Sequence, residues 1–83
     1  MNASKIPGLV KYIILETDGK EHPLVFSTFI RHDEMAPASG GHLVAAGYAI
    51  LTDGKAIVNG VGSGSLNLKS RPQDADIIQS LLR

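Results

Sequence analysis

Apolar runs rich in Val, Ile, Leu and Ala alternate with short polar segments along the chain, and two of these runs nearly repeat each other. Residues 12–20 read YIILETDGK, and residues 48–55 read YAILTDGK, one residue shorter. Each copy ends in Asp-Gly, which is typical of a hairpin between apolar runs because a type I′ turn needs positive φ at both central residues. The pattern therefore predicts two β-hairpins, with strands over residues 9–17, 21–27, 42–52 and 55–61.

Proline, glycine and serine mark the segments that flank the first hairpin. A Pro-Gly pair ends a loose arm over residues 1–8. After the second strand, Ser27 or Thr28 is placed to cap a short helical turn that runs to Met35. Residues 37–41, which combine proline, serine and glycine, are expected to form a flexible loop before the second hairpin.

The last third of the chain is predicted to contain a glycine-rich segment and then a helix. Three glycines within residues 60–64 interrupt the fourth strand, so we expect a bulge or open loop, after which residues 65–68 resume a strand. The helix should begin at about residues 71–73, since Pro72 suits the first helical position and acidic residues follow it. The pair Ser70–Gln73 has the spacing of a capping box.

These elements predict an α+β fold with one domain over residues 1–83. It consists of an antiparallel sheet of four to five strands built from two hairpins, with a C-terminal helix packed on one face. Both long strands are apolar on both faces, unlike a half-solvated antiparallel sheet. In the third strand, alternation predicts two opposed sets: Val44, Ala46, Tyr48 and Ile50 against Leu43, Ala45, Ala49 and Leu51.

One short terminal helix can cover only one face of such a sheet. Either residues 29–35 fold over the second face, or a second subunit covers it. Exposed apolar patches on small domains usually mark interfaces, and closed homo-oligomers are common. We therefore expect the chain to bind itself as a homo-oligomer, a dimer or higher.

Composition narrows the classes of function. Eight basic residues balance eight acidic ones, which argues against general nucleic-acid binding. No apolar run approaches the length of a membrane span, and residues 1–5 lack the apolar core of a signal peptide, so a soluble cytoplasmic protein is expected. The absence of cysteine excludes disulfides and thiolate metal sites.

No group of residues has the spacing of a catalytic or metal site. His22, His32 and His42 lack the i, i+4 spacing of helical metal ligands. Gly62-Ser63-Gly64 is not a nucleophile elbow, because only one residue separates its glycines. We therefore predict a protein that is not an enzyme and that uses no cofactor or metal.

The segment from Asn59 to Ser65, NGVGSGS, is the best candidate for binding a ligand. Glycines let backbone amides approach an anion closely, serines add donors, and a helix N-terminus should lie nearby. The segment matches neither the P-loop nor the dinucleotide-binding pattern. We predict a small anionic ligand, such as a signalling nucleotide, bound by Ser63, Ser65, Lys69 and Arg71.

Each of these features also has a purely structural interpretation. The glycines are equally consistent with a bulge at a sheet edge, with Arg71 paired to Asp74 or Asp76 across the start of the helix. Tyr12 and Tyr48 occupy equivalent places in the two repeats. They could act as stacking platforms for a base or a partner, or pack on each other across the strands.

The run SLNLKSRPQDA, residues 65–75, resembles the C-terminal end of small uncharacterised phage and prophage proteins. These share a glycine- and serine-containing strand followed by a Ser-Arg-Pro-x-Asp-Ala helix start. The resemblance implies a virion component, an inhibitor of host defence or a protein that sequesters signalling nucleotides, located in the host cytoplasm.

The function expected from the sequence is therefore that of a small non-enzymatic binding protein. It would act as a homo-oligomer on a host protein or on a small anionic ligand. The alternative is a structural or assembly protein without a ligand, whose exposed sheet face is the interface.

Overall fold

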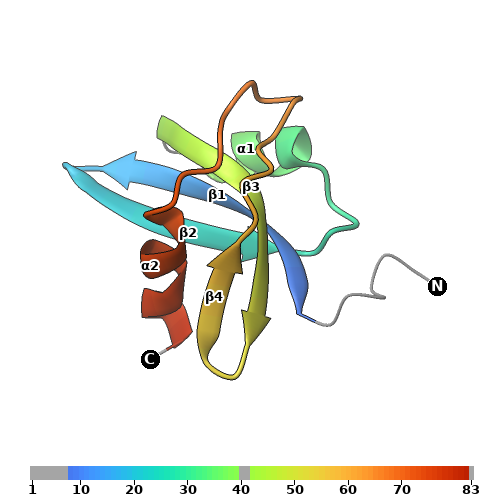
Figure 1. Ribbon diagram of the computed structural model, residues 1–83. Coiled ribbons are helices and arrows are strands. Elements are labelled where there is room, and N and C mark those ends of the chain that lie inside the picture. Colours follow the sequence, from blue (N-terminus) through green and yellow to red (C-terminus); the bar gives the residue numbers. More distant parts are fainter. Residues whose placement is uncertain (1–7, 40–41, 83) are drawn as a thin grey trace.

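A computed structural model describes residues 8–39 and 42–82 (Figure 1). Its four strands form one antiparallel sheet in the order β2-β1-β3-β4, which confirms the predicted α+β fold with a C-terminal helix packed on the sheet. The elements are β1 (Leu9–Thr17), β2 (Lys20–Phe26), α1 (His32–Ser39), β3 (His42–Thr52), β4 (Lys55–Val58), α2 (Asp74–Gln79) and the 3₁₀ turn η2 (Ser80–Leu82).

The two Asp-Gly pairs form the turns that the sequence predicts. Asp18 and Gly19 have φ values of 53° and 77°, and Asp53 and Gly54 have 51° and 75°. Positive φ at both central residues is the signature of a type I′ turn, whose twist matches that of the flanking strands. The two hairpins are therefore determined locally, by the residues of the turns themselves.

The connection between the hairpins is more helical than the sequence suggested. Ser27 does cap a turn, since its Oγ accepts from Phe29 N at 3.1 Å and its carbonyl from Ile30 N at 3.0 Å, but the helix itself begins at His32. The predicted loop over residues 37–41 was wrong for residues 37–39, which extend α1, while residues 40–41 lie outside the described residues. Proline was one reason to expect a loop there, but its fixed φ is compatible with a helix, at the loss of one backbone hydrogen bond.

The second hairpin also differs from expectation, because β4 ends at Val58 and no fifth strand follows over residues 59–82. The next segment instead makes a tight turn, closed by Ser63 N to Leu68 O at 2.9 Å and Leu68 N to Ser63 O at 3.1 Å. Asn67 adopts a positive φ of 55° inside it. The alternating Leu66 and Leu68, which resemble a strand pattern, are thus presented by a turn.

A β-bulge changes which residues of β3 share a face. Ile14 of β1 pairs with Ala45, but the next residue, Leu15, pairs with Leu43, so Val44 is the extra residue. The bulge moves Leu43 onto the face that carries Ala46, with which it packs. Simple alternation had placed Leu43 on the opposite face, and this prediction was wrong because a bulge reverses the alternation on one side of it.

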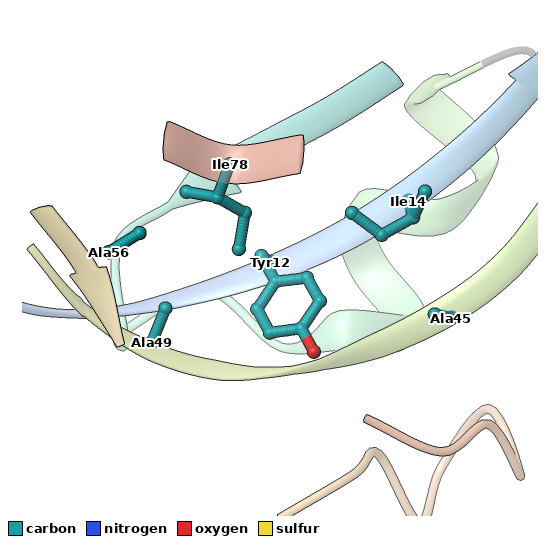
Figure 2. Close-up of a cluster of buried hydrophobic side chains, with 6 residues drawn as sticks. All are labelled: Tyr12, Ile14, Ala45, Ala49, Ala56 and Ile78. Carbon is teal, nitrogen blue, oxygen red and sulfur yellow. The ribbon is translucent and has the colours of Figure 1, made fainter. Parts of the chain in front are cut away.

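The first face of the sheet holds a core built around Tyr12 and covered by α2 (Figure 2). The ring of Tyr12 lies between alanines of β3, and Ile78 of α2 packs above the ring. The Tyr12 hydroxyl points away from Ile78. Both side chains have no exposed surface. Burying a side chain such as Ile78 contributes roughly 1.5–3 kcal/mol. The fully or nearly buried members are Tyr12, Ile14, Ala45, Ala49, Ala56 and Ile78.

The second face is covered by the chain's own segments. Ile13, Phe26 and Ala46 form its buried centre, against which Ile30 and Met35 pack from the α1 side. Leu66 and Leu68 pack there from the turn after β4. The sequence left open whether residues 29–35 or a second subunit covers this face. The structure shows that residues 29–35 cover it, together with the turn over residues 63–68. An oligomer stays a prediction, but it is no longer needed to cover this core.

The outer edge of β4 is partly closed by the C-terminal helix. Ala56 N of this edge strand donates to the Gln79 side-chain oxygen of α2 at 3.3 Å. Helix α2 packs beside both β4 and β2 (Figure 1). The helix therefore covers the Tyr12 core and also occupies a backbone donor that strand pairing leaves open.

Candidate functional site

A hollow of about 440 Å³ lies in the segment that follows β4, where the sequence placed its best ligand candidate. All eight lining residues fall between Gly60 and Ser70. Its polar side chains are Ser63, Asn67, Lys69 and Ser70, and Lys69 is the one charged residue among them. A space of this size is within the range of small-molecule sites.

Two glycines allow the walls of this hollow to lie close to the sheet and to each other. A Cβ on Gly47 of β3 would come within 2.6 Å of Val61 O, and one on Gly62 within 2.5 Å of Leu68 O. Either contact would force backbone apart, so the path of the segment depends on glycine at both positions. Gly47 belongs to the site's scaffold, although no sequence pattern indicated a role for it in the site.

The predicted ligand residues Ser63, Ser65 and Lys69 have different surroundings. Ser63 lines the hollow but is 4% exposed, and its Oγ accepts from Leu66 N at 3.3 Å. Ser65 lies outside the lining and contacts Ser63 Oγ at 3.3 Å. Lys69 is exposed in the lining and forms no ion pair within residues 8–39 and 42–82.

Arg71 is engaged by two carboxylates instead of facing the hollow. Its Nε donates to Asp74 Oδ1 at 2.8 Å, and its Nη2 lies 2.7 Å from the same oxygen. Its Nη2 also lies 2.8 Å from Glu21 Oε1, across the sheet in β2. Hydrogen bonding from Arg71 lowers the pKa of Glu21. The structural interpretation of Arg71, pairing with Asp74, is therefore what the structure shows, with Glu21 as an added partner.

Asp74 is a fully buried carboxylate, and both of its oxygens accept hydrogen bonds. Oδ1 accepts from the Arg71 guanidinium, while Oδ2 accepts from Arg71 N at 2.8 Å and from the Tyr12 hydroxyl at 2.7 Å. Tyr12 has one hydroxyl hydrogen, so Ser70 Oγ, 2.7 Å away, donates to the phenol oxygen. Burial, helped by the neighbouring carboxylate, raises the pKa of the Tyr12 phenol.

This arrangement also corrects the predicted start of the helix. The side chain that reaches back to cap it is Asp74, on Arg71 N, and not a Ser70–Gln73 box. Gln73 stands at the N-cap with no side-chain cap hydrogen bond. The helix N-terminus expected to favour a ligand anion is thus already occupied by the chain's own carboxylate.

The two repeated tyrosines lie on opposite faces of the sheet. Tyr12 pairs in register with Gly47, and Tyr48 pairs with Lys11, one position along both strands. Tyr12 is fully buried, whereas Tyr48 is half-buried on the other face. They can therefore neither pack on each other nor form a joint stacking platform, and Tyr12 has no surface to offer a ligand.

A second polar group fixes α1 against the sheet. His32 is 5% exposed, and its Nε2 lies 2.8 Å from Gly47 O, so the neutral ring carries its proton on Nε2. Its ring meets Phe26 and Tyr48 edge-on, with centroids 5.6 and 5.4 Å away. Burial lowers the pKa of His32. The group has the contacts of a packed core histidine.

Lys11 lies beside this histidine without a carboxylate partner in the described part of the chain. Its Nζ donates to Ile30 O at 2.9 Å and sits 5.8 Å from the Tyr48 ring centroid. Among residues 8–39 and 42–82, no three His, Asp or Glu side chains gather as metal ligands would. This face therefore has a structural role.

A smaller hollow of about 260 Å³ adjoins the larger one and shares Gly60 and Ser70 with it. Its remaining lining comes from Val58, Arg71 and Pro72. The two hollows are therefore neighbours, located where β4 ends and α2 begins.

Comparisons with protein-family models, curated proteins and solved structures find no match to this chain. Over the described residues, no helix is both long and apolar enough to cross a membrane.

Proposed function

We propose that this chain is a non-enzymatic binding protein whose site is the larger hollow, and that it takes a small ligand bearing a negative charge. The observation that carries the proposal is Lys69, a cation without an ion pair among the described residues, placed in a wall of glycine and serine backbone. Exposed amides and hydroxyls beside one ammonium group favour an anion.

The residues assigned to the ligand differ from those expected from the sequence. Lys69 supplies the charge, and Asn67, whose side chain makes no hydrogen bond within the described residues, supplies a free amide. Ser70 lines the same wall, although its hydroxyl hydrogen is donated to Tyr12. Arg71 serves the scaffold of the site, since both of its edges are bound by carboxylates.

A thermal-shift and calorimetry screen tests this function. Inorganic phosphate, carboxylic acids and linear and cyclic nucleotides are titrated into the wild-type chain, and one of these classes is expected to bind. Lys69→Ala should weaken that binding at least tenfold, because it removes the only charge in the lining. Lys55→Ala, at the β3–β4 turn, is the matched control and should leave it unchanged. Equal loss in both variants would contradict the site.

A second candidate is binding to a protein, either a partner or another copy of the chain. Several large apolar side chains are exposed, with Phe29 at 76% and Val61 at 53%. Ile57, Leu81 and Leu82 are exposed as well. Exposed apolar side chains mark protein–protein interfaces when they form one contiguous patch. This candidate needs no ligand and corresponds to a structural or assembly role.

A further inference from the structure

The smaller hollow differs in chemistry from the larger one beside it. Val58 and Pro72 give it apolar walls, and Arg71 completes it, whereas the larger hollow has serine, asparagine and lysine. At about 260 Å³ it is smaller than the usual small-molecule site, which holds roughly 300–1,000 Å³. Alone it fits only part of a ligand, and the shared Gly60 and Ser70 place it next to the larger hollow.

The Arg71 guanidinium is held along two of its edges by carboxylates, which leaves its flat face and one Nη1 hydrogen for a ligand. Asp74 binds Nε and Nη2, and Glu21 binds Nη1 at 3.3 Å and Nη2 at 2.8 Å. All three nitrogens are thus engaged in the plane of the group. A guanidinium held by its edges stacks on aromatic rings through its face, with little further loss of side-chain freedom.

We propose that the two hollows take one two-part ligand, in which a flat aromatic ring lies against Arg71 and Pro72 and an acidic group lies near Lys69. This inference rests on the proposed function and adds the ligand's class. The smallest common molecule of this class is a nucleoside monophosphate, with its base in the smaller hollow and its phosphate in the larger.

The charges set the direction of this ligand. Around Arg71 the carboxylates of Glu21 and Asp74 outnumber the single cation, so a phosphate placed there would meet net repulsion. Lys69 has no such carboxylate neighbour among the described residues. A neutral ring at Arg71 with the acid at Lys69 therefore agrees with the charges, and the reverse orientation does not.

Calorimetry with AMP, adenosine, ribose 5-phosphate and inorganic phosphate tests the two-part ligand. AMP should bind at least tenfold more tightly than either of its halves, adenosine or ribose 5-phosphate. Lys69→Ala should reduce AMP to the affinity of adenosine and leave adenosine unchanged. Equal affinity for AMP and ribose 5-phosphate overturns the ring subsite while the anion site stands. No binding of any of the four overturns the two-part ligand, and the carboxylic acids of the first screen then decide whether the anion site stands.

Two further measurements test the position of the ring and the direction of the ligand. AMP and adenosine should shift the NMR signals of the Val58 methyl groups upfield through ring currents, and ribose 5-phosphate should not. Glu21→Gln weakens the hold on the outer edge of Arg71, so it should lower the affinity for AMP by less than tenfold and should not raise it. A tenfold gain would place the phosphate on Arg71, and unshifted Val58 methyls would remove the ring from the smaller hollow; either result overturns the inference.

Discussion

At the scale of single residues, one carboxylate joins three parts of the molecule. Asp74 accepts hydrogen bonds from Tyr12 of β1 and from Arg71, and Arg71 in turn binds Glu21 of β2. Both oxygens of this buried acid accept hydrogen bonds, and a cation lies beside them, which are the conditions under which a buried charge is tolerated. The cost of removing it should therefore be large.

Asp74→Ala is expected to destabilise the chain by about 3–5 kcal/mol, because it leaves a buried phenol and a guanidinium without their acceptor. Urea unfolding followed by circular dichroism measures the change. Asp76→Ala, an exposed acid on the same helix, is the matched control and should cost within about 0.5 kcal/mol. Similar small losses for both variants would show that the network does not hold the helix.

His32 should make stability depend on pH. Burial lowers its folded-state pKa, despite the hydrogen bond to Gly47 O and with Lys11 adding to the shift and Asp33 opposing it. The unfolded chain, whose histidine has a pKa of about 6.5, then binds the proton first. The contribution of His32 to the free energy of unfolding should therefore be complete above about pH 6.5 and be lost as the pH falls towards the lower folded-state pKa.

The measurement is the unfolding free energy between pH 8 and pH 5, compared with His32→Gln. The variant should lose most of the slope over this range, whatever its absolute stability. His42→Gln, an exposed histidine at the start of β3, should keep the wild-type slope. A wild-type slope in His32→Gln would assign the effect to other groups.

The residue scale also shows how far the sequence could predict the site. Arg71 and Asp74 are three positions apart, so their pairing followed from helical spacing. Glu21 and Tyr12 are 50 and 62 positions away from their partners in the network, and their contact depends on the strand register and on the path of the last segment. No local pattern carries that information.

At the scale of elements, what was predicted correctly was determined locally. The Asp-Gly turns require particular φ values at their own residues, so both hairpins could be predicted from short stretches. No turn residue marks the bulge at Val44 or the extension of α1 to Ser39, so neither could be predicted in the same way. The 63–68 turn was mistaken for a possible strand because its leucines alternate, although it covers a sheet face instead of joining an edge.

Gly47 gives a prediction at this scale. Gly47→Ala should destabilise the chain by about 1–3 kcal/mol and weaken ligand binding, since its Cβ would be 2.6 Å from Val61 O and must move the wall of the hollow. Gly54→Ala is the control for backbone strain alone: it has φ +75° and no atom within 4 Å of its Cβ. It should cost about 1–2 kcal/mol and leave the ligand's affinity unchanged. Wild-type ligand affinity in Gly47→Ala would show that the shape of the hollow does not depend on the close approach of Gly47 to Val61.

At the scale of the whole molecule, the sheet is covered on both faces by one chain. Tyr12 and Ile78 mark the face under α2, and Ile13 and Met35 mark the face under α1. The two apolar faces that first suggested a second subunit are therefore accounted for over much of their area. The sequence could count the apolar faces, but it could not place the segments that cover them.

An oligomer, if it forms, should use the apolar side chains that remain exposed. We expect light scattering at micromolar concentration to give a dimer or higher, and Phe29→Ser or Ile57→Ser to shift it towards the monomer of 8.8 kDa. Both side chains are more than half exposed, so neither change should lower stability much. A wild-type mass near 8.8 kDa would remove the oligomer from the proposal.

The contact between Gln79 and Ala56 has a consequence for self-assembly. Edge strands with free backbone groups can add strands from other molecules, which is the first step of sheet polymerisation. In this chain a side chain of α2, that of Gln79, occupies a backbone donor at the edge of β4, and Asp74 fixes α2 to the sheet through Tyr12. Detachment of α2 would therefore expose the free edge of β4 together with the core. Variants that destabilise the docking of α2 should for this reason aggregate as well as unfold at a lower temperature.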